Sequence, residues 1–128
     1  MKRMSWLSSL PHQIPFRAAS AVRSREDKKI TGVFLWTAND IMPPEIMLVE
    51  AMAQFAGGLA FHARGHGFLT GVESCVVSRA IIPGDVITIE VTLETDFGGI
   101  FRFSGTATID GLECGRGRFY LASPDAQT

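Results

Sequence analysis

The feature that most constrains the fold is a long apolar stretch, residues 45–64, in the middle of the chain. Pro43 and Pro44 precede it, and proline suits the first turn of a helix, where its missing N–H has no partner anyway. The following side chains are apolar almost all round, which predicts a helix enclosed by protein. Residues 46–61 would span about 24 Å, less than the ~30 Å core of a membrane, so we expect no membrane span.

The chain after residue 67 has the pattern of antiparallel strands joined by tight turns. Residues 86–94 alternate apolar and polar side chains with period two, which is typical of a strand with one wet face. Turns are predicted at residues 83–85, 96–99 and 110–111, the last being an Asp-Gly hairpin signal. The expected strands are residues 18–25, 29–37, 68–82, 86–94, 100–109 and 112–122.

One long helix between two short strands and a run of consecutive strands predicts an α+β fold with the helix packed on one face of the sheet. With 128 residues, 46% of them hydrophobic, the chain can build one core, so we expect a single domain over residues 1–128. Residues 1–10 are expected to form an N-terminal arm and residues 123–128 a frayed tail. The helix is apolar on more sides than one sheet can cover, which predicts at least a dimer.

Composition and charge argue against several classes of function. The formal net charge is -1, and charges of both signs are mixed, so we expect no nucleic-acid partner. The N-terminus lacks an unbroken apolar segment with a cleavage site, so we expect no secretory signal and a cytoplasmic location. Cys75 and Cys114 have no metal-ligand spacing and are expected to be reduced core thiols. With no phosphate-binding loop, nucleophile motif or metal-ligand cluster, we expect no cofactor and no metal.

Glu50 is the side chain that most indicates chemistry, because it lies at the centre of the apolar stretch. Burial would raise the pKa of its carboxyl towards the range useful for proton transfer. Gln54, four residues on, shares its helical face and could orient the carboxylate or contact a ligand. In the alternative interpretation, Glu50 only bonds a strand backbone or an arginine such as Arg79, and the residues alone leave both open.

The three histidines have different expected roles. His62 and His66 lie at the end of the expected helix, where the helix dipole favours a cation, and capping is the favoured role. His12 lies between Pro11 and Pro15 and could be a structural hydrogen-bonding group or a general base, of which the structural role is favoured.

Three short segments form a set of motifs. Residues 10–16 are Leu-Pro-His-Gln-Ile-Pro-Phe, residues 48–54 are Leu-Val-Glu-Ala-Met-Ala-Gln, and residues 81–85 are Ile-Ile-Pro-Gly-Asp. Together they resemble the motifs L-P-H-R-x-P-F, I-V-E-A-M-A-Q and V-V-P-G-D of the FabZ and FabA type of 3-hydroxyacyl-acyl-carrier-protein dehydratases. The resemblance runs from Leu10 to Ala122 and implies a hot-dog fold, in which a curled antiparallel sheet wraps a long central helix.

The resemblance also implies a composite active site, with acyl tunnels near a dimer interface and a histidine and a glutamate from opposite protomers. Glu50 matches the family's glutamate. The family places its histidine in a glycine-rich loop before the helix, and counting back from Glu50 without a gap puts Trp36 there. An indole has no acceptor for a proton, so the base would have to come from elsewhere, with His12, Asp40 and Asn39 as the local candidates.

The expected function is elimination of water from a 3-hydroxyacyl thioester of acyl carrier protein or coenzyme A, in fatty-acid or polyketide metabolism. Glu50 and His12 are the expected catalytic residues, and a homodimer or dimer-based oligomer is the expected assembly. One alternative is a non-catalytic acyl-thioester-binding protein, and another is a hot-dog thioesterase in which Glu50 activates water. The expected substrate contacts are Trp36, Asn39, Asp40 and Gln54.

Overall fold

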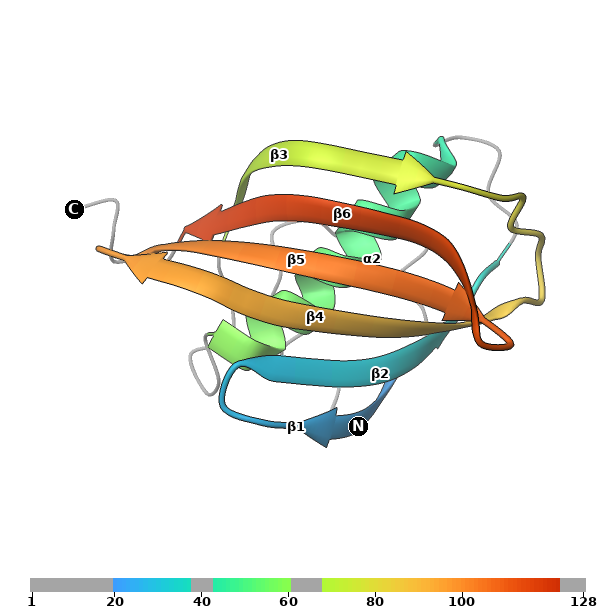
Figure 1. Ribbon diagram of the computed structural model, residues 1–128, viewed down its shortest axis with the longest axis horizontal. Coiled ribbons are helices and arrows are strands. Elements are labelled where there is room, and N and C mark those ends of the chain that lie inside the picture. The colour runs from blue at the N-terminus through green and yellow to red at the C-terminus, as the bar shows by residue number, and fades with distance from the viewer. Residues whose placement is uncertain (1–19, 38–42, 61–67, 123–128) are drawn as a thin grey trace.

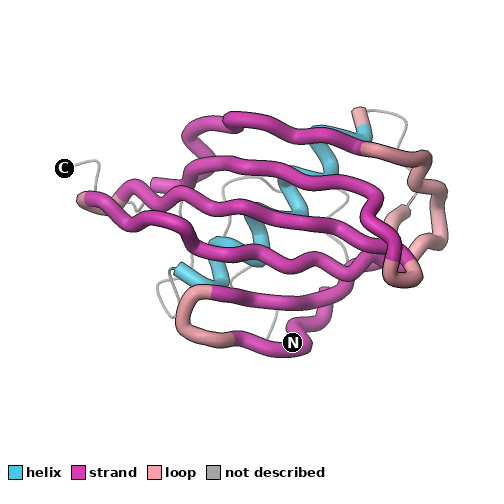
Figure 2. The backbone as a smooth tube through the Cα atoms, viewed as in Figure 1, coloured by secondary structure: helices cyan, strands magenta, loops and turns pink. Residues whose placement is uncertain are grey.

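In the computed structural model, which describes residues 20–37, 43–60 and 68–122, an antiparallel sheet wraps one helix (Figure 1). The sheet has six strands in the order β1-β2-β4-β5-β6-β3. Figure 2 shows the strands curving over the helix, which runs obliquely behind them in this view. This confirms the α+β arrangement expected from the sequence. The elements are β1 (Ser20–Arg25), β2 (Lys29–Leu35), α2 (Pro44–Ala60), β3 (Phe68–Val77), β4 (Val86–Phe97), β5 (Ile100–Ile109) and β6 (Leu112–Ala122).

Two glycine-containing turns join β4, β5 and β6 into consecutive hairpins. Asp110 and Gly111 have φ angles of 52° and 81°, as a two-residue hairpin turn of the mirror-image type requires, so the predicted Asp-Gly turn is confirmed. The other turn is shorter than residues 96–99. Gly98 and Gly99 take the positive φ angles, 60° and 88°, so pairing continues as far as Phe97 with Ile100.

Strand β3 is shorter than expected and lies away from its neighbours in sequence. It ends at Val77 rather than at residue 82, and the N–H of Ser78 then donates to the carbonyl of Cys114 at 2.9 Å. In the sheet, β3 pairs with β6 and not with β4, which follows it in the chain. The crossover places β3 at the opposite edge of the sheet from β1 (Figure 1).

Helix α2 forms the centre of the core. Every residue from Met47 to Leu59 is buried, as the all-round apolar pattern predicts. Small residues on the inner face of the sheet let the helix come close. A Cβ atom added at Gly105 would lie 2.7 Å from the Sδ atom of Met52, and one added at Gly115 would overlap the side chain of Leu48. Within the described residues, no helix combines the length and apolar character that a membrane crossing needs.

The start of α2 is tied to its surroundings by backbone contacts. The N–H groups of Ile46 and Met47 donate to the carbonyl of Pro43, at 3.1 and 3.2 Å. The thiol of Cys75 on β3 donates to the carbonyl of Glu45 at 3.3 Å. Cys75 and the buried Cys114 are both free thiols, as expected, and burial raises the pKa of each. The expected arm, residues 1–10, and tail, residues 123–128, lie outside the described residues.

Candidate functional site

Glu50 and Gln54 form a buried polar pair on α2. Their exposed fractions are 8% and 4%, and they are the buried polar or charged side chains of the part of the chain described. Each helical residue rotates by about 100°, which puts Glu50 roughly 160–200° from Leu48 and Met52 and only about 40° from Gln54. Because Leu48 and Met52 press on the glycines of the sheet, the polar pair lies on the opposite side of the helix.

A carboxyl group in this position is suited to proton transfer. Val49, Ala51 and Ala53, which are close to Glu50 along the helix, are buried with it. A buried carboxyl can exchange a proton with a ligand without competition from bulk water, provided the ligand reaches it. The burial that the sequence predicted for Glu50 is confirmed, and Gln54 has the shared face expected from its spacing.

Trp36 follows directly after β2 and is part of the core. Its indole is 6% exposed, and its ring centre lies 5.9 Å from that of Phe34, with the two rings tilted by 57°. Trp36 belongs to the same hydrophobic cluster as Met47 and Val49 of α2. Its backbone N–H donates to the carbonyl of Asp85 at 2.9 Å. This residue is therefore held firmly, with its side chain on the same core as the helix that carries Glu50.

The other expected site residues lie outside the described part of the chain. His12, Asn39 and Asp40 are among them, and so are His62 and His66. Of the six expected site residues, the structure thus places Glu50, Gln54 and Trp36. No three His, Cys, Asp or Glu side chains of the described residues are grouped so that they could hold a metal ion.

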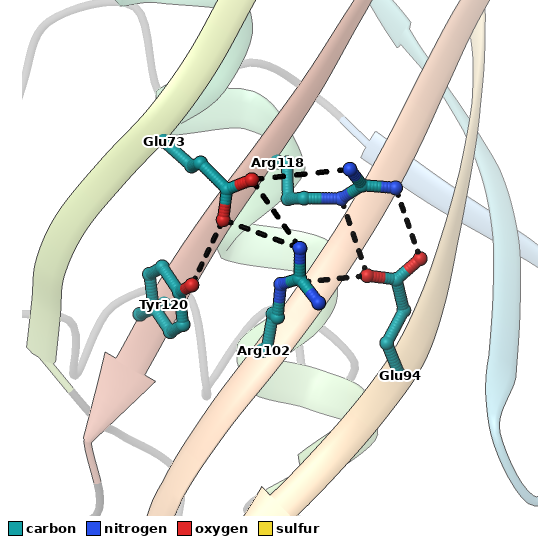
Figure 3. Close-up of polar contacts among 5 residues, drawn as sticks. All are labelled: Glu73, Glu94, Arg102, Arg118 and Tyr120. Carbon is teal, nitrogen blue, oxygen red and sulfur yellow. Dashed lines mark hydrogen bonds and ion pairs between the residues drawn. The ribbon is translucent and has the colours of Figure 1, made fainter.

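A second cluster of charged residues, which sequence reasoning missed, lies on the outer face of the sheet (Figure 3). Glu73 accepts a hydrogen bond from Tyr120 at 2.8 Å and from Arg102 at 3.3 Å. Glu94 lies 3.3 Å from Arg118 and 3.7 Å from Arg102. Arg102 and Tyr120 alternate along their strands with buried phenylalanines, so the cluster faces away from α2. It connects β3, β6, β5 and β4.

Both carboxylates of the cluster lie at β-bulges. Glu73 and Glu94 each lie at a register shift, in β3 and β4 respectively. The alternation of the sequence gives no warning of such shifts. The hydrogen bond from Tyr120, with the charges of Arg102 and Arg118, lowers the pKa of Glu73. A carboxylate held ionised in this way is a poor proton donor near neutral pH, so we interpret this cluster as structural.

Comparisons with known proteins place the chain in a family. No protein-family model matches it. The 3-hydroxyacyl-[acyl-carrier-protein] dehydratase FabZ of Erwinia tasmaniensis is 32% identical over an alignment of 119 residues, covering 80% of this chain and 79% of that protein. The chain belongs to the FabZ family. FabZ of Cronobacter sakazakii is 30% identical over 126 residues, with 82% and 81% covered.

Solved structures confirm that this FabZ-family chain has the hot-dog fold. The dehydratase heterocomplex ApeI:P from Xenorhabdus doucetiae matches with a TM-score of 0.74 and 21% identity, over 90% of this chain and 88% of that one. A hypothetical thioesterase from Streptococcus pneumoniae, solved with coenzyme A, matches with a TM-score of 0.68 and 13% identity, over 81% and 87%. At these identities the likeness concerns the fold alone.

Proposed function

We propose that this FabZ-family chain eliminates water from a 3-hydroxyacyl group held as a thioester on acyl carrier protein or coenzyme A. A base removes a proton from the carbon next to the thioester carbonyl. The hydroxyl on the following carbon leaves with a proton from a general acid, giving an enoyl thioester and water. Glu50 is the general acid, and its burial at the centre of α2 is the observation that carries the proposal. Gln54 orients its carboxyl or a polar group of the substrate.

The base is the open part of this proposal. Trp36 stands where an ungapped count from Glu50 puts the family's histidine, and an indole accepts no proton. His12 and Asp40 have side chains that can accept one, and Asn39 could position a water or the thioester. We therefore assign the base to His12 first, with Asp40 second, and place Trp36, Asn39 and Asp40 against the acyl thioester.

A second candidate function is acyl-thioester binding without turnover by this chain alone. The observation that favours it is the setting of Trp36, whose indole is packed into the core beside Phe34. By analogy with ApeI:P, which is a dehydratase heterocomplex, a chain that has Glu50 and Trp36 in place of the histidine would work beside a second subunit that supplies the base.

Assembly into a homodimer, or a dimer-based oligomer, is part of the proposal. Strand β3 is at an edge of the sheet, and within the described residues it pairs only with β6. Two of its valines, Val72 and Val76, are 48% and 53% exposed. An edge strand with exposed apolar side chains favours pairing with another chain. Sedimentation of the purified protein measures the assembly directly.

The test is an assay of the purified protein with 3-hydroxybutyryl coenzyme A and the matching acyl-carrier-protein thioester, following both enoyl formation and thiol release. The variants are Glu50→Gln, His12→Ala and Trp36→His, and Glu73→Gln on the outer face is the matched control. Loss of a general acid lowers the rate by about 10²- to 10⁴-fold. Glu50→Gln should show such a loss and Glu73→Gln should not.

The products separate the candidate functions. Enoyl product that depends on both Glu50 and His12 supports the dehydratase with a relocated base. Ligand binding without product, together with turnover gained in Trp36→His, supports the binding subunit. Thiol release that depends on Glu50 identifies a thioesterase, and the S. pneumoniae neighbour is described as a hypothetical thioesterase. Equal rates in the parent and in Glu50→Gln contradict the role given to Glu50.

A further inference from the structure

The chain between β3 and β4 ends in a tight turn, Ile82 to Asp85, which is closed by two hydrogen bonds between these residues. The N–H of Asp85 donates to the carbonyl of Ile82 at 3.1 Å. Between them stand Pro83 and Gly84, and Gly84 has a φ of +98°. Proline followed by a residue with positive φ fits a type II turn, in which glycine is the residue that takes this conformation without strain.

The side chain of Asp85 makes the second hydrogen bond across this turn. Its Oδ2 atom accepts the N–H of Ile82 at 2.9 Å, while its own N–H donates to the carbonyl of the same residue. A carboxylate that accepts a backbone N–H makes a charge-assisted bond, which is stronger than a bond between neutral groups. The conformation of the turn therefore depends on the carboxylate as well as on Pro83 and Gly84.

The same turn holds the backbone of Trp36 at both of its polar groups. The N–H of Trp36 donates to the carbonyl of Asp85 at 2.9 Å, and its carbonyl accepts the N–H of Gly84 at 2.8 Å. Strand β2 has already ended at Leu35, so the turn, and not a strand, fixes residue 36. The buried indole can pack against Phe34 only while this backbone stays in place.

We propose that Asp85 is a positioning residue for Trp36, and that it thereby sets where the indole lies against the bound acyl chain. The second half of this inference rests on the proposed function, which places Trp36 at the acyl site. Asp85 acts through the turn, whose two hydrogen bonds to Trp36 transmit any loosening at the carboxylate to the indole.

Fluorescence of Trp36 tests the first half without any assay of activity. The chain has two tryptophans, so Trp6→Phe leaves Trp36 as the sole reporter. In that background, Asp85→Ala should shift the emission to longer wavelength and increase quenching by acrylamide, since water gains access to the indole. Asp85→Asn keeps an oxygen that can accept the N–H of Ile82, so it should stay close to the parent. Asp96→Ala, at the exposed end of β4, is the matched control.

All spectra are taken where urea unfolding shows each variant to be fully folded, so that loss of the fold does not imitate the effect. An Asp85→Ala spectrum equal to the parent's, or an equal shift in Asp96→Ala, overturns the inference. If Asp85→Ala destabilises too far, Asp85→Asn compared with Asp85→Ser at low temperature gives the same contrast, because the shorter hydroxyl reaches the N–H of Ile82 less well.

Titration of the single-tryptophan proteins with 3-hydroxybutyryl coenzyme A tests the second half. Binding should quench Trp36 in the parent and in Asp85→Asn, and Asp85→Ala should weaken the binding. If Asp85→Ala moves the emission but leaves binding unchanged, the hold on Trp36 stands and the placement of Trp36 at the acyl site is wrong. If the parent binds no acyl thioester at all, the proposed function fails, while the spectra still decide the role of Asp85.

Discussion

The two faces of the sheet differ in their side chains: small residues on the inner face admit α2, and charged residues on the outer face form ion pairs exposed to solvent. On the inner face, Gly105, Gly115 and Gly117 leave room for α2, which carries the buried Glu50 on its opposite side. On the outer face, the carboxylates of Glu73 and Glu94 are 41% and 27% exposed, and both form ion pairs with Arg102 and Arg118. The difference teaches where chemistry is possible. Arginines and Tyr120 hold the carboxylate of Glu73 ionised on the outer face, whereas Glu50 is buried in the core, where a carboxyl can exchange a proton with a ligand away from bulk water.

A substitution that fills the space between the inner face of the sheet and α2 should have the largest effect on stability. A Cβ atom at Gly115 would overlap Leu48 and lie 2.9 Å from the backbone carbonyl of Val76, which cannot move without disturbing β3. We expect Gly115→Ala to lower the free energy of unfolding by about 1–3 kcal/mol, as overpacking does. Urea unfolding at pH 7 measures it.

The matched control is a glycine on the outer face. A Cβ atom at Gly71 would meet only Tyr120, at an ordinary contact distance of 3.9 Å. Gly71→Ala should therefore leave stability unchanged or raise it by about 0.4–1 kcal/mol, since alanine restricts the unfolded chain. Equal losses in the two variants would mean that the glycines of the inner face are not there to admit the helix.

The same contrast shows how much of the molecule the sequence predicts. The helix and the β4 to β6 hairpins carry local signals, which are paired prolines, all-round apolar side chains, period-two alternation and the Asp110 and Gly111 turn. The position of β3 beside β6 could not be predicted, because strand pairing across the chain has no local signal. The bulges at Glu73 and Glu94 shift the strand register, and the alternation of side chains in the sequence does not reveal such shifts.

The candidate site was predicted to a similar extent. Glu50 and Gln54 follow from a polar pair four residues apart in an apolar helix, and both are buried as expected. The hydrogen bonds between the turn at Asp85 and the backbone of Trp36 were not predicted, because the Pro-Gly-Asp sequence indicates a turn but not what the turn contacts. Neither the base nor the substrate contacts outside the described residues follow from any local pattern.

Low pH should remove the stability that Glu73 contributes on the outer face of the sheet. The hydrogen bond from Tyr120 and the charges of Arg102 and Arg118 lower the pKa of Glu73 from its ordinary value of 4.5. Because the folded state binds this proton less readily than the unfolded state, the stability that Glu73 contributes is present above pH 4.5 and is lost as the pH falls through the lowered value.

Comparison of the parent with Glu73→Gln from pH 7 to pH 3 checks the sign. The parent should be the more stable protein at pH 7, and the difference in the free energy of unfolding should shrink on acidification. Tyr120→Phe removes the largest cause of the shift and should reduce the part that depends on pH. A difference that stays constant across this range would show that Glu73 keeps an ordinary pKa in the folded protein.

The ion pair of Glu94 with Arg118 gives the smallest expected effect. The two side chains are 27% and 41% exposed, and the Nε of Arg118 is 3.3 Å from the carboxylate. Among the described residues this Nε has no hydrogen-bond partner, and the hydrogen bond of the pair is a long one, from the Nη2 of Arg118 to Glu94 at 3.4 Å. A double-mutant cycle with Glu94→Gln and Arg118→Met should give a coupling of about 0.2–1 kcal/mol, as exposed pairs do. High salt should reduce it, because solvent ions screen charges at the surface. A coupling that salt leaves unchanged would mean that the bulge shields the pair from solvent, and the outer-face carboxylate would then be less exposed than the contrast with the buried Glu50 assumes.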